Sequence, residues 1–346
     1  MESLAPDHFS PGTTYLDTAA SGLIPTGAAA AMAASVAAAS EGRPQEEVFS
    51  AAVEAARAAC GRLLGVPAGR VAAGSSVAVY CGLIAQSLPA GSEVLVAEGD
   101  FSSLVNPFHV RPGLRVRTVP LERIAEEVRP GTALVAVSAV QSAEGRIADL
   151  DAIGAAARAH GARTLIDVSQ AAGWLPVDAA AHDYTACVGY KWLMCPRGTA
   201  FLTVPEDLGG LVPVFAGWVS GEDPRESCYG RVEPMAASAR RFDENVPVFS
   251  YVAARESLRL VESLGVERVG AYDVALADRF RVGVARLGHA PVEAAGSAIV
   301  AVPGLGGAAE RLATQGVHVS ARAGRLRAAF HLYNTAADVD RLLEAL

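Results

Sequence analysis

The stretch from Arg163 to Val204 constrains the fold of this chain more than any other stretch. It begins with a short apolar run, Thr164-Leu165-Ile166, which is typical of a buried parallel strand and brings Asp167 to the carboxyl end of that strand. A second short apolar run leads into Gly189-Tyr190-Lys191-Trp192. An acid and a lysine at the ends of neighbouring strands, with glycine beside them, predict a cofactor site at the carboxyl edge of an α/β sheet.

Pyridoxal phosphate is the cofactor whose chemistry fits these residues. Its aldehyde needs a lysine amine to form a Schiff base, and its pyridinium nitrogen needs a buried carboxylate to stay protonated. Lys191 and Asp167 would fill those two roles, and Gln170 would donate a hydrogen bond to the 3′-oxygen of the ring. The alternative is that Asp167 caps a turn and Lys191 lies on the surface. Their combination inside an apolar segment favours the cofactor site.

The same residues carry a family resemblance. D-x-x-Q at Asp167, followed by K-W-L-x-x-P-x-G-x-x-F from Lys191 to Phe201, resembles the class V aminotransferase family of fold-type I pyridoxal phosphate enzymes. The resemblance extends from Tyr15 to Leu346. The family includes cysteine desulfurases, kynureninase, isopenicillin N epimerase-like proteins, carbon–sulfur lyases and transaminases. It implies an enzyme, and a homodimer whose active sites lie at the subunit interface.

The alternation of strand and helix patterns through residue 188 predicts an α/β fold with a mostly parallel central sheet. We expect an N-terminal arm and helix at 1–40, a large cofactor-binding domain at 41–247 and a smaller α+β C-terminal domain at 248–346. Helices are predicted at 28–40, 51–64, 121–128, 149–160, 250–263, 266–286 and 336–346. Strands are predicted at 93–97, 114–119, 133–140, 297–302, 317–321 and 325–331, besides those of the central motif.

Composition limits the function classes. Of the 346 residues, 51% are hydrophobic and 19% are charged, which predicts a large core. The net charge of -8 argues against binding to nucleic acid or to an anionic membrane surface. The five cysteines form no C-x-x-C pair, which favours reduced thiols in a cytoplasm over a disulfide framework or a zinc site. The opening residues lack the apolar core of a signal peptide.

Two segments are candidates for holding the cofactor phosphate. Ser75 and Ser76 follow Gly74 where a loop becomes a helix, and a helix N-terminus with serine hydroxyls binds anions. The alternative is an ordinary serine N-cap. The resemblance implies a phosphate contact from Tyr190, which could instead be a buried tyrosine bonded to the backbone. It also implies a threonine from the partner subunit, and here Asn245 would substitute for that missing residue in part.

Other residues are assigned to the cofactor ring and the substrate through the resemblance. Phe101 follows the strand at 93–97 and would stack on the ring, although an ordinary core role is equally open. Gln141 follows the strand at 133–140 and would point at the ring or at the substrate carboxylate. Ala20, in the entry segment at 13–22, would help to seat the substrate. Arg327 would pair with the α-carboxylate, and Arg322 is the alternative.

Two absences shape the expected reaction. Desulfurases carry a nucleophilic cysteine shortly before the arginine strand, and residues 317–327 contain none, so persulfide-forming chemistry is not expected. No histidine adjoins the cofactor motifs, so Lys191 is the expected general base. Phe101 and Tyr190 resemble the kynureninase-like and lyase-like members of the family, and this resemblance favours cleavage of a Cβ–X bond in a small α-amino acid. Transamination is the alternative, followed by epimerisation and by a catalytically inactive protein that retains the fold.

Overall fold

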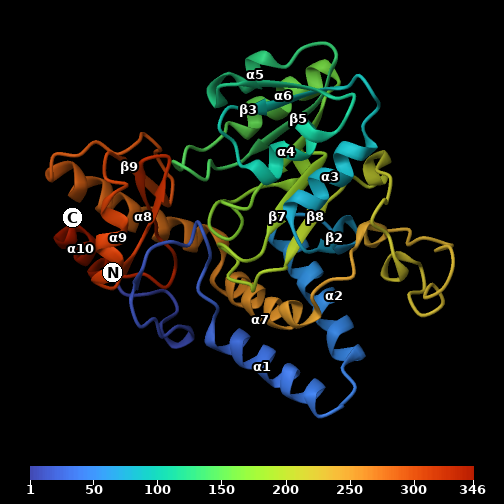
Figure 1. The fold of residues 1–346 in the computed structure, drawn as a ribbon, viewed down its shortest axis with the longest axis horizontal. Coiled ribbons are helices and arrows are strands. Elements are labelled where there is room, and N and C mark those ends of the chain that lie inside the picture. The colour runs from blue at the N-terminus through green and yellow to red at the C-terminus, as the bar shows by residue number, and fades with distance from the viewer.

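The computed structural model describes residues 1–346 and has a seven-stranded sheet at its centre (Figure 1). Across the sheet the strands run in the order β2 (Val71–Gly74), β8 (Ala200–Thr203), β7 (Tyr184–Val188), β6 (Arg163–Asp167), β5 (Thr132–Ser138), β3 (Glu93–Ala97) and β4 (Arg115–Val119). Strand β8 is antiparallel to both of its neighbours, and the other pairings are parallel. The predicted α/β class with a mostly parallel sheet is therefore confirmed.

The two faces of this sheet bury alternate residues of the same strands. On β6, Ile166 packs into one apolar cluster and Leu165 into another. The first cluster lies against α2 (Glu46–Leu63), α6 (Leu150–His160) and α7 (Val248–Leu264), and the second against α3 (Val77–Ser87) and α4 (Ser102–Val110). Because both faces are covered, the inner strands are nearly continuous apolar runs, whereas the edge strand β4 has polar residues at alternate positions.

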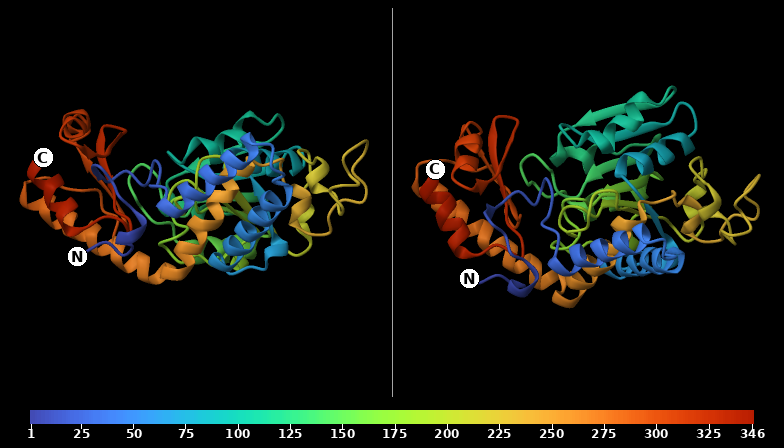
Figure 2. Two further views of the ribbon diagram at one scale, coloured as in Figure 1. Left: turned by 90° about the horizontal axis from the view of Figure 1, so that it is seen from below. Right: turned by 60° about the horizontal axis from the view of Figure 1, so that its bottom comes forward.

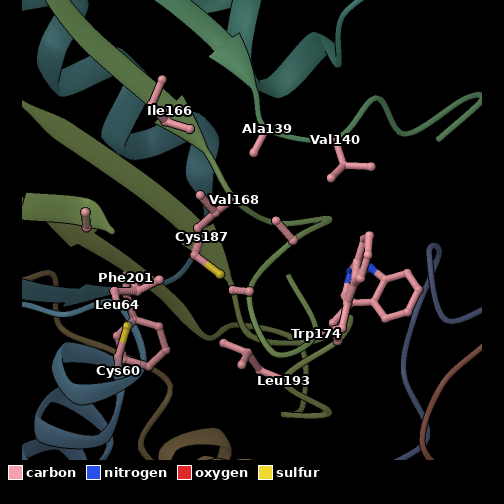
Figure 3. Packing of buried hydrophobic residues seen from close by; sticks show 14 of the residues in the cluster. Cys60, Leu64, Ala139, Val140, Ile166, Val168, Trp174, Cys187, Leu193 and Phe201 are labelled. Carbon is pink, nitrogen blue, oxygen red and sulfur yellow. The ribbon is translucent and has the colours of Figure 1, made fainter. Parts of the chain in front are cut away.

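Figure 3 shows part of the first cluster from close by. Phe201 of β8 and Cys187 of β7 lie near Cys60 of α2 and near Leu64 just beyond that helix. Four of the five cysteines are buried and all five are free thiols. Burial raises the pKa of the Cys187 thiol well above its usual value, so this thiol serves as an apolar core residue.

The C-terminal part of the chain forms a second body beside the large sheet (Figure 2). It contains α8 (Val266–Arg286), α9 (Ala308–Thr314), α10 (Ala336–Ala345) and an antiparallel sheet of β9 (Ile299–Pro303), β12 (Arg325–Ala329) and β11 (Ser320–Arg322). Its own apolar cluster lies between α8 and this sheet. This is the smaller α+β unit that the C-terminal sequence predicts.

The N-terminal arm connects the two bodies. Strand β1 (Thr14–Tyr15) pairs in parallel with β10 (Val317–His318) of the C-terminal body. Beyond it, the Gly22 N–H donates to the carbonyl of Tyr190 at 2.9 Å, beside the predicted cofactor lysine. Helix α1 (Thr26–Ser40) then packs against α7. None of the helices combines the length and the apolarity that are needed to cross a bilayer.

Several predicted element boundaries are wrong, for identifiable reasons. The predicted strand at 133–140 ends at Ser138, because the Ser138 N–H and hydroxyl bind Asp100 at 2.9 and 2.6 Å. Helix α4 is not among the predicted helices, and it contains Pro107, a residue that usually argues against a helix interior. The predicted strand at 317–321 is two strands, because β10 pairs with β1 and β11 pairs with β12.

The predicted division of the chain at residue 248 stays a prediction. Helix α7 begins at Val248 but packs against α1 and α2, on the side of the large sheet. A break between α7 and α8 follows at Gly265, which has a φ of +82°. This arrangement favours a domain boundary close to Gly265.

Candidate active site

Asp167 and Lys191 come from neighbouring strands of the large sheet. Asp167 is the last residue of β6, and Lys191 follows β7 by three positions, so both lie at the same carboxyl edge. The two side chains are buried, at 4% and 5% exposure. Burial raises the pKa of the Asp167 carboxyl, and the Lys191 amine opposes part of that shift. Burial lowers the pKa of Lys191, and Asp167 acts in the opposite direction.

Lys191 is the only lysine in the sequence, beside 28 arginines among the 29 basic residues. A neutral primary amine is the group that condenses with an aldehyde, and a guanidinium does not do this. The chain therefore offers one side-chain amine for this chemistry and holds it at the edge of the sheet.

Gln170 is fixed by the residues around it. Its Nε2 donates to the Ala19 carbonyl and to the Ser142 hydroxyl, both at 2.9 Å. Its Oε1 accepts from the indole N–H of Trp192 at 2.8 Å. Both amide hydrogens are thus in use, and a bond to a cofactor 3′-oxygen would have to replace one of these partners. In this structure Gln170 joins the N-terminal arm to the residue after Lys191.

Phe101 and Gln141 lie on the segments that follow β3 and β5. The Phe101 ring is 41% exposed, and the Lys191 Nζ lies 5.0 Å from its centroid. Phe101 is therefore not an ordinary core residue. Gln141 is buried, and its Nε2 has no hydrogen-bond partner. A buried amide N–H without a partner is costly, and a ligand oxygen would satisfy it.

The N-terminus of α3 already holds a carboxylate. The Ser75 N–H and hydroxyl donate to Glu244 at 3.0 and 2.7 Å, while the Ser76 hydroxyl accepts from the Val79 N–H at 3.4 Å as a helix N-cap. The site thus attracts anions as predicted, but a cofactor phosphate would meet Glu244 there. Asn245, the next residue, is exposed and forms no hydrogen bond, and Glu244 makes the contact instead.

Arg327 lies on β12 and is 1% exposed. Its Nη1 donates to the Ser142 carbonyl at 2.7 Å, and its Nη2 forms an ion pair with Asp17 at 3.1 Å. Its Nε is buried without a partner. Arg322, the alternative carboxylate ligand, is exposed at the end of β11.

A cavity of about 210 Å³ brings together residues from all these segments. Its basic lining residues are Lys191, Arg197, Arg322 and Arg327. Its other lining residues are Ala19, Ala20, Phe101, Ser142 and Tyr190. Of the residues predicted for the site, five line this cavity together with Arg322: Ala20, Phe101, Tyr190, Lys191 and Arg327. The other predicted residues do not line it: Ser75, Ser76, Gln141, Asp167, Gln170 and Asn245.

A buried histidine links the C-terminal body to the segment that carries Lys191. His331 binds Asp273 of α8 through Nδ1 at 2.8 Å and the Trp192 carbonyl through Nε2 at 2.9 Å. The carbonyl can only accept, so Nε2 carries a hydrogen. His331 and Asp273 have no exposed surface, and burial raises the pKa of Asp273 to about 6, against the opposing effect of His331.

Sequence reasoning missed four contributors to this site. Glu244 and Arg197 lie inside segments that were already singled out, but their roles depend on contacts with distant residues. His331 and Asp273 are 58 residues apart and show no motif. The presence of only one lysine in the sequence is a further signal for Lys191.

The residues fit pyridoxal phosphate. A buried amine and a buried carboxylate interact at the edge of a parallel sheet, and Gln141, three residues after the end of the neighbouring strand β5, offers an unsatisfied donor. The N-terminus of α3 supplies hydrogen-bond donors for an anion, as the Glu244 contact demonstrates. Together with the two-body fold, these features define an α/β enzyme that binds pyridoxal phosphate.

Comparison with known proteins identifies the family. The chain matches the family described as aminotransferase class-V over residues 14–342. It therefore belongs to the aminotransferase class-V family and is a pyridoxal phosphate-dependent enzyme of that family. The predicted family, cofactor and enzymatic character are confirmed.

The similar proteins carry names of different reactions. The chain is 28% identical over 229 residues to an uncharacterized aminotransferase of Bacillus subtilis, a match that covers 62% of this chain and 60% of that protein. It is 31% identical over 232 residues to kynureninase of Deinococcus radiodurans, covering 63% of this chain and 56% of the relative. These matches span less than two thirds of either relative.

A solved structure shows the fold over nearly the whole chain. The complex of the cystine C–S lyase C-DES with its product cysteine persulfide superposes with a TM-score of 0.86 at 23% identity, covering 96% of this chain and 97% of that one. At this identity the likeness establishes the fold and leaves the reaction open.

Proposed function

We propose that this enzyme cleaves a Cβ–X bond in a small α-amino acid. The observation that carries the proposal is a single buried amine, Lys191, that faces a small cavity shared with Arg327. The cavity lining contains no cysteine to take up sulfur and no histidine to handle protons. The similarity to kynureninase, together with Phe101 and Tyr190 in the positions that resemble kynureninase-like members, supports the lyase over the desulfurase reaction.

The cofactor supplies the aldehyde that captures the substrate amine and a ring that withdraws electrons from Cα. Asp167 would keep a proton on the ring nitrogen, because a buried carboxylate opposite a cation is stabilised in that pairing. Ser75, Ser76 and Tyr190 would hold the phosphate, with Asn245 beside them, and this requires Glu244 to leave the Ser75 N–H and hydroxyl. Phe101 and Gln141 would contact the ring, and Gln170 fixes the segment after Lys191 through its bond to Trp192.

The substrate binds through its α-carboxylate to Arg327, next to Ala20. The Arg327 guanidinium is held on two sides by Ser142 and Asp17, so little rotamer entropy is lost on binding. Lys191 Nζ then takes the proton from Cα. That amine is suited to the task because burial lowers its pKa toward the working range of a general base.

The proposed reaction balances as an elimination. The Cα–H bond breaks with its proton passing to Lys191, and the Cβ–X bond breaks with its electron pair leaving on X. The proton and X leave as HX, and one water converts the remainder to pyruvate and ammonia. Transamination is the second candidate, favoured by the similarity to the aminotransferase of Bacillus subtilis.

The visible absorption spectrum of the purified protein with added pyridoxal phosphate tests this proposal. Because the chain has one lysine, a band from the lysine-bound cofactor should vanish in Lys191→Ala, and borohydride reduction should label only the Lys191 peptide. Pyruvate and ammonia formed from β-chloroalanine would support the lyase. Accumulation of pyridoxamine phosphate that a keto acid discharges would support the transaminase instead.

We further propose that the protein works as a homodimer. Between β8 and α7, the segment at 205–247 projects from the side opposite the C-terminal body (Figure 1). It exposes a group of large apolar side chains: Val212, Val214, Phe215, Trp218 and Tyr229. Such a group is typical of an interaction surface.

Analytical ultracentrifugation tests the dimer. Phe215→Glu should yield monomer, because a charge would be buried in the proposed interface. Val282→Glu is the matched control, since Val282 is equally exposed but lies on α8 in the C-terminal body. A wild-type monomer, or a Phe215→Glu protein that remains dimeric, would contradict the assignment.

A further inference from the structure

The cavity at Lys191 has an excess of positive charge. Four of its nine lining side chains are basic and none is acidic. Asp17 compensates Arg327 through the ion pair at 3.1 Å. Arg197 and Arg322 form no ion pair with any carboxylate of the chain. Clustered cations without counter-charges are unfavourable, so a cavity of this kind favours an anionic ligand.

Arg197 is held in position from two directions. Its carbonyl accepts from the Ser250 hydroxyl at 2.9 Å, which fixes the turn between Lys191 and β8. Its guanidinium carbon lies 4.4 Å from the centroid of the Tyr190 ring. A guanidinium stacked on an aromatic face keeps its N–H groups available at its edge. The side chain is therefore arranged to bind an oxyanion and not only to fill space.

Arg322 reaches the same cavity from the C-terminal body. It ends β11, ahead of a hairpin turn, and the only hydrogen bond of its side chain runs from Nη1 to the Ala321 carbonyl at 2.8 Å. Four further N–H donors of this guanidinium are free. Arg197 and Arg322 thus approach one cavity from different bodies of the protein.

The substrate α-carboxylate accounts for only one of the three arginines. Arg327 is the most buried of them, and its Nε lacks a partner. Resting on the proposed function, we propose that the side chain of the substrate ends in an oxyanion and that Arg197 and Arg322 bind it. A cavity of about 210 Å³ has the volume of about seven water molecules, which suits a short acidic side chain.

Spectral titration of the cofactor-loaded enzyme tests the inference, with L-aspartate against the isosteric L-asparagine as ligands. We expect aspartate to perturb the cofactor band at a lower Kd. The selectivity is the Kd for asparagine divided by the Kd for aspartate. Arg197→Gln and Arg322→Gln should each reduce this ratio by ~10- to 100-fold, as expected for loss of a charge-assisted hydrogen bond. Arg268→Gln, which removes an exposed arginine of α8 that does not line the cavity, should leave that ratio unchanged.

A second measurement needs no cofactor. Calorimetry on the cofactor-free protein should show tighter binding of succinate than of butyrate, and Arg197→Gln should remove the difference. Equal binding of aspartate and asparagine to the wild type would overturn the inference. So would an Arg197→Gln protein that loses affinity for pyridoxal phosphate but keeps the ratio, since Arg197 would then bind the cofactor phosphate. Absence of the cofactor band in the wild type would instead overturn the proposed function, and the succinate measurement would still stand.

Discussion

Removing Arg57 should destabilise this protein far more than removing Arg62, a second arginine on the same helix. Arg57 of α2 is 4% exposed, and its guanidinium donates to both oxygens of Asp243, at 2.6 and 3.2 Å. Asp243 is equally buried and also accepts from the Ala73 N–H at 2.8 Å. In Arg57→Met, Asp243 would remain as a buried carboxylate with one hydrogen bond.

The expected magnitude follows from that burial. Removing one partner of a buried ion pair costs about 3–5 kcal/mol of unfolding free energy. Arg62 also pairs with a glutamate, Glu262, at 2.6 Å, but the arginine is exposed, so Arg62→Met should cost about 0–1 kcal/mol. The double variant Arg57→Met with Asp243→Leu leaves no buried charge. It loses the bond to Ala73, which costs about 1–3 kcal/mol.

Urea unfolding of the cofactor-free proteins, followed by circular dichroism, gives the comparison. The expected order of stability is wild type, then the double variant, then Arg57→Met, with Arg62→Met close to wild type. Equal losses in Arg57→Met and Arg62→Met would refute the reasoning. A double variant no more stable than Arg57→Met would also refute it, because the buried charge would then not be the cause.

Three further outcomes are expected. Gly22→Ala should weaken pyridoxal phosphate binding by ~10-fold, because the new Cβ would lie 2.1 Å from the Lys191 carbonyl oxygen. Gly27→Ala is the control, since Gly27 has open space around it, and equal effects of the two variants would contradict the clash. Glu244→Gln should tighten cofactor binding by ~10-fold in a spectral titration, because it removes a negative charge beside Ser75; weaker binding would mean that Glu244 supports the phosphate site. The rate of cofactor capture, measured by stopped flow, should rise with pH and level off below pH 10.5, which is the usual pKa of lysine. The reason is that burial lowers the pKa of Lys191 and only the neutral amine attacks the aldehyde. A rate that still rises at pH 10.5 would contradict the lowered pKa.

The sequence predicts the central sheet and the positions of Lys191 and Asp167 because these depend on local patterns. Each residue ends or closely follows an apolar strand, and parallel neighbours bring both to one edge. The same reasoning predicts the C-terminal body, since its strands and helices also carry their own periodicity. Boundaries failed where a side chain from elsewhere intervened, as Asp100 does at the end of β5.

Contacts across the chain could not be predicted in this way. Ser75 has the pattern of an anion site, but nothing in its neighbourhood indicates that Glu244, 169 residues later, binds there. Gln170 was identified from its spacing to Asp167, whereas its hydrogen bonds depend on how the N-terminal arm folds back. Residue type and spacing identify candidate ligands, and only the packed structure decides which of their atoms remain free.

The pairing of β1 with β10 has a consequence for the order in which the protein matures. Thr14 pairs with Val317, so strand β1 can form its pairing only after the ribosome has synthesised β10, about 300 residues later. Arg327 is synthesised later still, although the large sheet with Asp167 and Lys191 is complete well before. During synthesis the lysine edge of the sheet therefore forms before the arginines opposite it exist, and the binding cavity can be completed only after Arg327 has been translated.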